Sequence, residues 1–265
     1  MRDPIVDRIA RDAGVPDLVD VLADRLAPTD LQSVLIAVAR RRADGTSPAD
    51  VLRRYQEDRF SRPANVSPEA LRAVEAIAFE ELPAGFERIE LSPVCPLGTS
   101  AALGGVSQDR ILTTTRGTEV MSDPTSVLAL ECALRRRTDR SRPVRLAASQ
   151  RVLRTPPVEP PLTQHFHLFV LCSAGRREDE DAFLAEHLRF YERLLDRAAR
   201  GAVEADPTPR KQTYYSGKAF GITVAGLEVV EGGFVDWTAR LLGDRKERLL
   251  TSGIGLELLA RSAPR

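Results

Sequence analysis

Lysine is nearly absent from this chain of 265 residues. Lys211, Lys218 and Lys246 are the only lysines among its 38 basic residues, and the others are arginines. The same number of acidic residues brings the formal net charge to zero. A dedicated nucleic-acid binder needs an excess of basic residues to displace counterions from phosphates. The composition therefore argues against that class, and the preference for arginine by itself indicates no function.

Cysteines and long apolar runs are also scarce. Cys95, Cys132 and Cys172 are widely spaced and odd in number, which fits a reducing, cytoplasmic compartment and not a disulfide framework. We expect them to be small buried hydrophobes. No apolar run approaches the roughly 18 residues of a membrane span. The first residues, MRDPIVDRIARD, include acids and lack an apolar core. The sequence therefore predicts neither a signal peptide nor contact with a membrane.

The first 62 residues have the spacing of short amphipathic helices. Apolar stripes occupy residues 5–10, 18–26 and 31–39. Asp30 is predicted to cap the third helix, and Ser47-Pro48 opens a fourth. Each helix is expected to bury one face. We predict a helical module of residues 1–62 that packs on something else, as a lid, a dimerisation extension or a docking module for a protein partner.

The remainder of the chain, residues 67–265, mixes helical and strand patterns. Caps and periodicity predict helices over residues 67–82, 123–137 and 178–200, with a last one near Gly255. Apolar and β-branched runs predict strands over residues 86–94, 111–120, 144–154, 165–174, 213–224 and 226–237. Several of these strands follow one another directly. We therefore predict an α+β fold with a largely antiparallel sheet flanked by helices.

Several local features have ordinary structural explanations. His165 and His167 share one strand face, which could supply half of a metal site, but no third ligand has suitable spacing, so no metal site is predicted. The glycines of PLGTSAALGGVSQD (96–109) lack the context of a phosphate loop and indicate a flexible connection. The acidic run 178–181 and the arginines 135–137 are expected to be solvated charge near helix ends.

Four stretches of the sequence say more about the fold when they are taken together, in their order along the chain, than any one of them does alone. They are GFERIELSPVCP (85–96), RVLRTPP…HFHLFVLCSAG (151–175), RKQTYYSGKAFGITV (210–224) and EGGFVDW…SGIGLELL (231–259). Together they resemble the catalytic core of a class II aminoacyl-tRNA synthetase of the histidyl type, including paralogues such as the regulatory subunit of ATP phosphoribosyltransferase. The resemblance extends from about residue 67 to 260. It implies a class II synthetase-like sheet and, through the first stretch, a homodimer.

The resemblance implies two catalytic arginines. Arg154 matches the second-motif arginine that holds the nucleotide α-phosphate, a task suited to a planar, permanently charged fork. RKQTYY matches the family's RGLDYY, so Arg210 falls on the arginine that stabilises the transferring carboxylate. In the same match Tyr214 and Tyr215 fall on pocket tyrosines.

Further ligand-binding residues follow from the other matches. MSDPT (121–125) resembles RPEGT, which places Asp123 on a substrate-binding glutamate and retains Thr125, although Asp123 serves equally well as a helix N-cap. EGGFVDW and GIGLELL resemble AGGRYDG and the third motif, GxGLERL. They retain Gly232, Gly233, Asp236, Gly253, Gly255 and Glu257. The glycines would let the backbone approach a nucleotide closely.

Departures from the family pattern bear on function. Leu258 replaces the third-motif arginine, and Arg261 would need a different backbone path to take its place. The second-motif glutamate is Pro156 and the arginine of GGRYD is Phe234. Losing two ATP-facing arginines removes roughly 1.5–3 kcal/mol each, which would weaken adenylation. Leu168 and Cys172 occupy the positions that read the imidazole of histidine. We therefore expect a ligand less polar than histidine.

The expected function is therefore a binding or regulatory role for a paralogue with a small amino-acid- or nucleotide-like ligand. The alternative is an ATP-dependent ligase, with ATP and Mg²⁺, that passes an activated carboxylate to a carrier protein or amine. A third possibility is a structural partner that docks through the helical module. We do not expect tRNA as a partner, because no anticodon-binding domain follows the last helix and the family insertion before Arg210 is missing.

Overall fold

The computed structural model describes residues 3–156, 163–198, 203–206, 214–224 and 226–262. Contacts within the chain group Met1–Glu57 with Thr113–Thr118 as one compact unit, and Asp58–Leu112 with Glu119–Arg265 as a second. This grouping describes packing and not independent folding, so the predicted boundary between residues 62 and 67 stays a prediction.

The first unit is helical. It contains α1 (Pro4–Asp12), α2 (Leu18–Asp20), the π-helical turn η1 (Val21–Arg25), α3 (Pro28–Ala43) and α4 (Pro48–Glu57). The prediction that Asp30 caps the third helix is wrong. Helix α3 begins at Pro28, directly after Ala27, because the fixed φ of proline suits the first helical position. Asp30 lies in the first turn.

Most apolar side chains of this unit are exposed. Ile5, Val38 and Leu52 are 62%, 53% and 60% exposed, and Ala10 is the one buried residue among described residues 3–57. The apolar stripes therefore form helices but do not bury one face each, contrary to prediction.

The second unit contains a seven-stranded sheet of order β1-β4-β5-β9-β8-β7-β6. Its strands are β1 (Glu87–Arg88), β4 (Val144–Leu153), β5 (His165–Gly175), β6 (Val203–Asp206), β7 (Ala219–Val224), β8 (Leu227–Val235) and β9 (Arg248–Gly255). Strands β1 and β4 are parallel, and the other pairs are antiparallel. The predicted α+β fold with a largely antiparallel sheet is confirmed.

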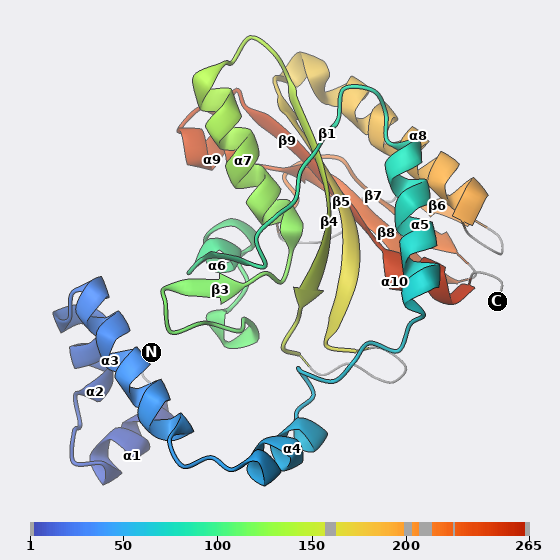
Figure 1. Cartoon of the computed structure of the whole chain (residues 1–265). Coiled ribbons are helices and arrows are strands. Elements are labelled where there is room, and N and C mark those ends of the chain that lie inside the picture. The colour runs from blue at the N-terminus through green and yellow to red at the C-terminus, as the bar shows by residue number, and fades with distance from the viewer. Residues whose placement is uncertain (1–2, 157–162, 199–202, 207–213, 225, 263–265) are drawn as a thin grey trace. The chain divides into compact units, whose positions relative to one another are not determined.

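Helices cover both faces of this sheet (Figure 1). Helix α7 (Pro124–Thr138) packs on one face, and α5 (Pro68–Glu81), α8 (Glu180–Ala198) and α10 (Leu256–Ser262) pack on the other. Successive side chains of β5 point to opposite faces of the sheet, so this strand contributes to the hydrophobic cores on both faces. Phe169 and Leu171 pack on the side of α8, whereas Val170 and Cys172 pack on the side of α7. None of the helices in the described part of the chain has the length and apolarity to cross a bilayer.

Two predicted strands are much shorter than expected. The apolar run 86–94 yields only β1 and the start of β2 (Val94–Pro96), and the run 111–120 yields only β3 (Thr118–Val120). In the second run Gly117 has a φ of 67°, which forces a turn before β3. Strand β9 and the short helix α9 (Trp237–Leu242) were not predicted.

The glycine-containing stretch 96–109 is ordered by a distant acid. Helix α6 (Thr99–Gly104) occupies its middle, so the prediction of a flexible connection is wrong. Glu119 is buried and accepts hydrogen bonds of 2.8 Å from the backbone amides of Gly98 and Ser100. Burial opposes ionisation of Glu119, but these bonds and one from Gln108 outweigh it and lower its pKa.

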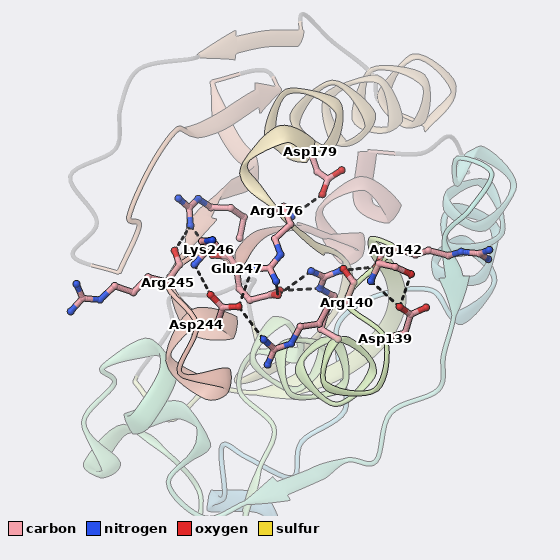
Figure 2. Close-up of polar contacts among 12 residues, drawn as sticks. Asp139, Arg140, Arg142, Arg176, Asp179, Asp244, Arg245, Lys246 and Glu247 are labelled. Atoms are coloured by element: carbon pink, nitrogen blue, oxygen red, sulfur yellow. Dashed lines mark hydrogen bonds and ion pairs between the residues drawn. The ribbon is translucent and has the colours of Figure 1, made fainter.

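A buried ion pair joins α7 to the loop before β9. Nε and Nη2 of Arg136 lie 2.9 and 3.0 Å from the two carboxylate oxygens of Glu247, and both side chains are at most 1% exposed. Figure 2 shows the surrounding cluster, in which Arg140 and Arg176 both contact Asp244. Arg136 is therefore structural and buried, and the prediction that it is solvated is wrong.

Candidate functional site

A cavity of about 870 Å³ opens beside the N-terminus of α7. Its walls come from strands β5, β8 and β9, helix α10 and the segment before β7. Most predicted site residues line it: Asp123, Thr125, Arg154, Tyr214, Tyr215, Gly253, Gly255 and Glu257. Residues separated by up to 134 positions thus meet in one cavity, in agreement with the motif order.

Asp123 caps α7, as predicted, and also lines the cavity. Its Oδ1 accepts hydrogen bonds from the backbone amide and the hydroxyl of Thr125, at 2.9 and 2.8 Å, and so caps α7. The same carboxylate lines the cavity. Because both bonds use Oδ1, Oδ2 can accept a hydrogen bond from a ligand.

Arg154 lies where β4 ends. Its backbone amide donates to the carbonyl of Gln164 at 2.8 Å, and its Nε donates to the carbonyl of Ser122 at 3.3 Å. The guanidinium carbon lies 5.2 Å from the ring centroid of Phe166, a cation–π contact that orients the fork. The terminal nitrogens can therefore bind a carboxylate or a phosphate in the cavity.

Tyr214 and Tyr215 form an aromatic wall with ring centroids 4.5 Å apart. The hydroxyl of Tyr214 donates to Oε1 of Glu231 at 3.4 Å. Burial, helped by the carboxylates of Glu231 and Asp123, raises the pKa of Tyr214 to about 12 and also raises the pKa of Tyr215. Both hydroxyls are therefore neutral hydrogen-bond donors near neutral pH.

Gly233 and Gly232 shape the site without lining the cavity. A Cβ on Gly233 would lie 2.5 Å from Cδ1 of Tyr215, and a Cβ on Gly232 would lie 2.6 Å from Cζ of Phe220. Both glycines allow an aromatic ring to rest on β8. Both glycines thus allow the cavity wall to pack closely, and their predicted contact with a ligand stays a prediction.

Asp236 is not brought to this cavity. It forms an ion pair of 3.0 Å with Arg240 and lines a second, more open depression of about 770 Å³. Arg210 lies outside the described residues, so its predicted position in the site is not observed.

Glu257 reaches the cavity from the first turn of α10. Its Oε1 accepts from Nη1 of Arg151 at 3.1 Å. The same guanidinium faces Nδ1 of His165 at 2.8 Å and Nδ1 of His167 at 3.2 Å. Because arginine can only donate, both Nδ1 atoms accept. The two histidines therefore share an arginine.

Some of the positions at which this chain departs from the family pattern line the cavity, and others do not. Leu168 and Leu258 line it, but the buried thiol of Cys172 lies 3.7 Å from the carbonyl of Thr125 and does not. Arg261 also lines the cavity, one turn of α10 after Leu258. Residues three apart share a helix face, so both side chains reach the cavity, and the expectation that Arg261 cannot directly replace the lost arginine stays a prediction.

Several residues that line the cavity were not predicted from the sequence. Glu231, Glu228, Trp237 and Thr251 line the cavity. The signal for Glu231 was its place between the apolar pair Val229-Val230 and Gly232-Gly233. Thr251 lies in β9, a strand that was not predicted.

Two guanidinium groups, those of Arg154 and Arg261, line the cavity. The guanidinium groups of Arg154 and Arg261 have the charge and geometry for phosphate oxygens. Among the described residues, no group of three or more His, Cys, Asp or Glu could hold a metal ion. A Mg²⁺ entering with a nucleotide would therefore be held largely by phosphates and water, as Mg²⁺ commonly is.

No family model matches the sequence, and no curated protein matches it. Solved structures do match. A pyrrolysyl-tRNA synthetase from Desulfitobacterium hafniense has a TM-score of 0.55 at 15% identity, over 98% of this chain and 81% of that chain. An ATP phosphoribosyltransferase regulatory subunit/histidyl-tRNA synthetase from Bacillus halodurans C has a TM-score of 0.59 at 12% identity, over 77% and 83%. The chain therefore has a class II aminoacyl-tRNA synthetase-like fold.

Proposed function

We propose that this protein binds a small amino-acid- or nucleotide-like ligand in a regulatory or binding role and does not aminoacylate tRNA. The observation that carries the proposal is the cavity itself, which most of the predicted ligand-binding residues line although Leu258 replaces an ATP-facing arginine. Asp123 would accept from an amino group, and Arg154 would bind a carboxylate or phosphate.

The apolar part of the lining favours a ligand with an aliphatic portion. Leu168, Val170 and Val229 cover the sheet side of the cavity. Burying a CH₂ group there contributes about 0.8 kcal/mol. Polar groups at the ends of the ligand would then set its orientation.

The alternative is an ATP-dependent ligase that activates an amino-acid-like carboxylate. One observation favours it: Arg261 restores a second arginine to the cavity close to the position of the lost one. In this role Arg154 would hold the α-phosphate. The acceptor would be a carrier protein or a small amine, since net charge zero does not suit tRNA.

Pyrophosphate exchange with each of the twenty amino acids, run beside a thermal-shift screen of amino acids and nucleotides, tests both. We expect no exchange and a stabilising ligand. ATP- and amino-acid-dependent exchange would replace the binding role with the ligase. If no compound stabilises the protein and no exchange occurs, both proposals are wrong.

The predicted homodimer and cytoplasmic location are also proposals. Sedimentation velocity at micromolar concentration, with a mass of 29.2 kDa per chain, would separate monomer from dimer.

A further inference from the structure

Trp237 belongs both to the cavity and to the hydrophobic core on the α7 side of the sheet. Its side chain lines the cavity, is 3% exposed, and packs in the same cluster of apolar residues as Leu128 and Val170. It is the only tryptophan of the chain and the first residue of α9. Because one side chain is at once wall and core, a smaller side chain at this position would extend the cavity towards the core.

The volume of the indole, and not a hydrogen bond, fixes its place. No residue in the described part of the chain accepts a hydrogen bond from Nε1 of Trp237. A buried tryptophan usually donates its N–H to a partner, and an unmet donor costs free energy. The described contacts of the ring are packing contacts, so a smaller apolar side chain in its place loses no hydrogen bond.

The charged groups that would hold an amino acid lie near this wall. Nε of Arg154 donates to the carbonyl of Ser122, the residue directly before Asp123. The carboxylate of Asp123 is close enough to Tyr214 to add to the rise that burial causes in the pKa of the phenol. The ring centroid of Tyr214 lies 6.4 Å from that of Trp237. An amino acid held through Asp123 and Arg154 therefore begins its side chain near Trp237.

The two threonines of the cavity offer a ligand few free donors. The hydroxyl of Thr125 donates to Oδ1 of Asp123 at 2.8 Å, and the hydroxyl of Thr251 donates to the carbonyl of Gly233 at 3.5 Å. A polar ligand side chain would give up its bonds to water without receiving a hydrogen bond from either threonine. An aliphatic side chain has no such bonds to give up, and its burial is favourable.

We propose that Trp237 sets the upper limit on the length of an aliphatic side chain of the ligand. The ligand class is an amino acid with an aliphatic side chain that ends against the indole. Asp123 and Arg154 contact the α-amino and carboxylate groups, which all such amino acids share, so the distance from these residues to Trp237 selects the ligand by size. This inference rests on the proposed binding function and names the ligand class for that site.

A homologous series of ligands tests this limit in the full-length protein. L-Alanine, L-2-aminobutyrate, L-norvaline, L-norleucine and L-2-aminoheptanoate each add one CH₂ group to the one before. By titration calorimetry we expect the affinity to rise about fourfold per CH₂ group, equivalent to about 0.8 kcal/mol, and to fall beyond an optimal length. Trp237→Leu should increase the optimal length by at least one CH₂ group, because the leucine side chain is smaller.

The fluorescence of Trp237 gives a second measurement that needs no variant. Because the chain has no other tryptophan, its emission reports this wall alone. We expect the ligand of optimal length to change the emission intensity and saturating L-alanine to leave it nearly unchanged. Equal responses to both ligands would show that the end of the side chain lies elsewhere in the cavity, and would overturn the proposal.

Leu128→Ala is the matched control for the calorimetry. Leu128 packs in the same cluster as Trp237 and is fully buried, but it is not one of the described residues that line the cavity. This variant should be less stable and should keep the optimal length of the wild type. Thermal unfolding would show that each variant folds. If Trp237→Leu does not fold, Trp237→Phe makes a smaller change and should shift the optimal length in the same direction.

Each other outcome overturns a definite statement. An optimal length that is unchanged in the Trp237 variants would overturn the role of Trp237 and leave the proposed binding function intact. An equal shift in Leu128→Ala would show that a loosened core, and not the wall, admits the longer ligand. If amino acids outside the series bind and none within it does, the ligand class is wrong. If no amino acid or nucleotide binds, the proposed function is wrong as well.

Discussion

Nη1 of Arg151 lies 3.1 Å from Oε1 of Glu257, and this ion pair joins the end of β4 to the first turn of α10. The same guanidinium contacts His165 and His167 on β5. One arginine outside the cavity thus organises a cavity carboxylate and the histidine pair that the sequence placed on one strand face.

Replacing Arg151 should change the titration of His167. Burial first, and then the charge of Arg151, lowers the pKa of His167. Arg151→Gln removes the positive charge, so we expect the pKa of His167 to rise towards 6.5, measured by NMR of the imidazole resonances. Burial remains, so the rise should be partial.

The buried His187 is the internal control. Its pKa is lowered to about 3, first by burial and then by Arg145, so it should not respond to Arg151→Gln. An unchanged pKa of His167 would contradict the contact.

Removing the side chain of Arg154 should weaken binding of the ligand. We expect Arg154→Ala to reduce the affinity for the metabolite that stabilises the wild type by roughly 10- to 100-fold, because a hydrogen bond to a charged group is worth about 1.5–3 kcal/mol. Titration calorimetry would measure it. Arg189 is an exposed arginine on α8 whose Nε donates to the carbonyl of Ala185 in the same helix, and Arg189→Ala should leave the affinity unchanged. Equal loss in both variants would contradict the assignment of Arg154.

Gly233 should not tolerate a side chain. In Gly233→Ala the new Cβ would lie 2.5 Å from Tyr215, so the ring must move away from the cavity wall. We expect a lower melting temperature and weaker ligand binding, measured by thermal shift with and without ligand. Gly104→Ala is the matched control, since its Cβ would meet Val106 at an ordinary 3.6 Å. A Gly233→Ala protein with unchanged affinity would remove Tyr215 from the site.

His187 should make the protein less stable in acid. It lies between Ser173 and Ser252, with ring nitrogens 3.0 and 2.7 Å from their hydroxyls, and is neutral in the folded state. Its pKa is about 3 when folded and about 6.5 when unfolded. The unfolded chain therefore binds an extra proton between these values. The contribution of neutral His187 to the free energy of unfolding is therefore complete above pH 6.5. It is lost as the pH falls towards 3, by about 1.4 kcal/mol per pH unit.

Urea unfolding at pH 7 and pH 5 would measure this loss. His187→Gln should have a smaller difference between the two pH values than the wild type. An identical difference would show that carboxylates alone cause the acid sensitivity.

The buried ion pair should be sensitive to loss of one partner. Arg136→Met leaves the buried carboxylate of Glu247 with the longer contact to Arg176 at 3.5 Å, and we expect a loss of stability in urea of at most about 3–5 kcal/mol. The double variant Arg136→Met/Glu247→Leu should lose less than the sum of the single changes. Lys218→Met breaks an exposed pair with Asp181 and should cost less than about 1 kcal/mol. Similar losses for Arg136→Met and Lys218→Met would contradict the buried pair.

Local chemistry allowed much of the fold to be predicted. Asp123-Pro124 and Ser67-Pro68 start α7 and α5 as expected, because capping oxygens and a fixed proline φ act within one turn. The alternating apolar runs became β4 and β5. Most of the site residues predicted from the motifs also line one cavity.

Long-range packing decided the remainder. Arg136 meets Glu247 111 positions away, and Glu119 caps α6 about 20 positions before it. Glu231 and Arg261 became cavity residues only when β8 paired with β9 and α10 packed on α5 and β5. The sequence determined the longer elements and the caps at Ser67 and Asp123, because those forces are local. Tertiary structure alone decided which charges are buried together and which face a ligand, because that depends on side chains that the chain brings together from far apart.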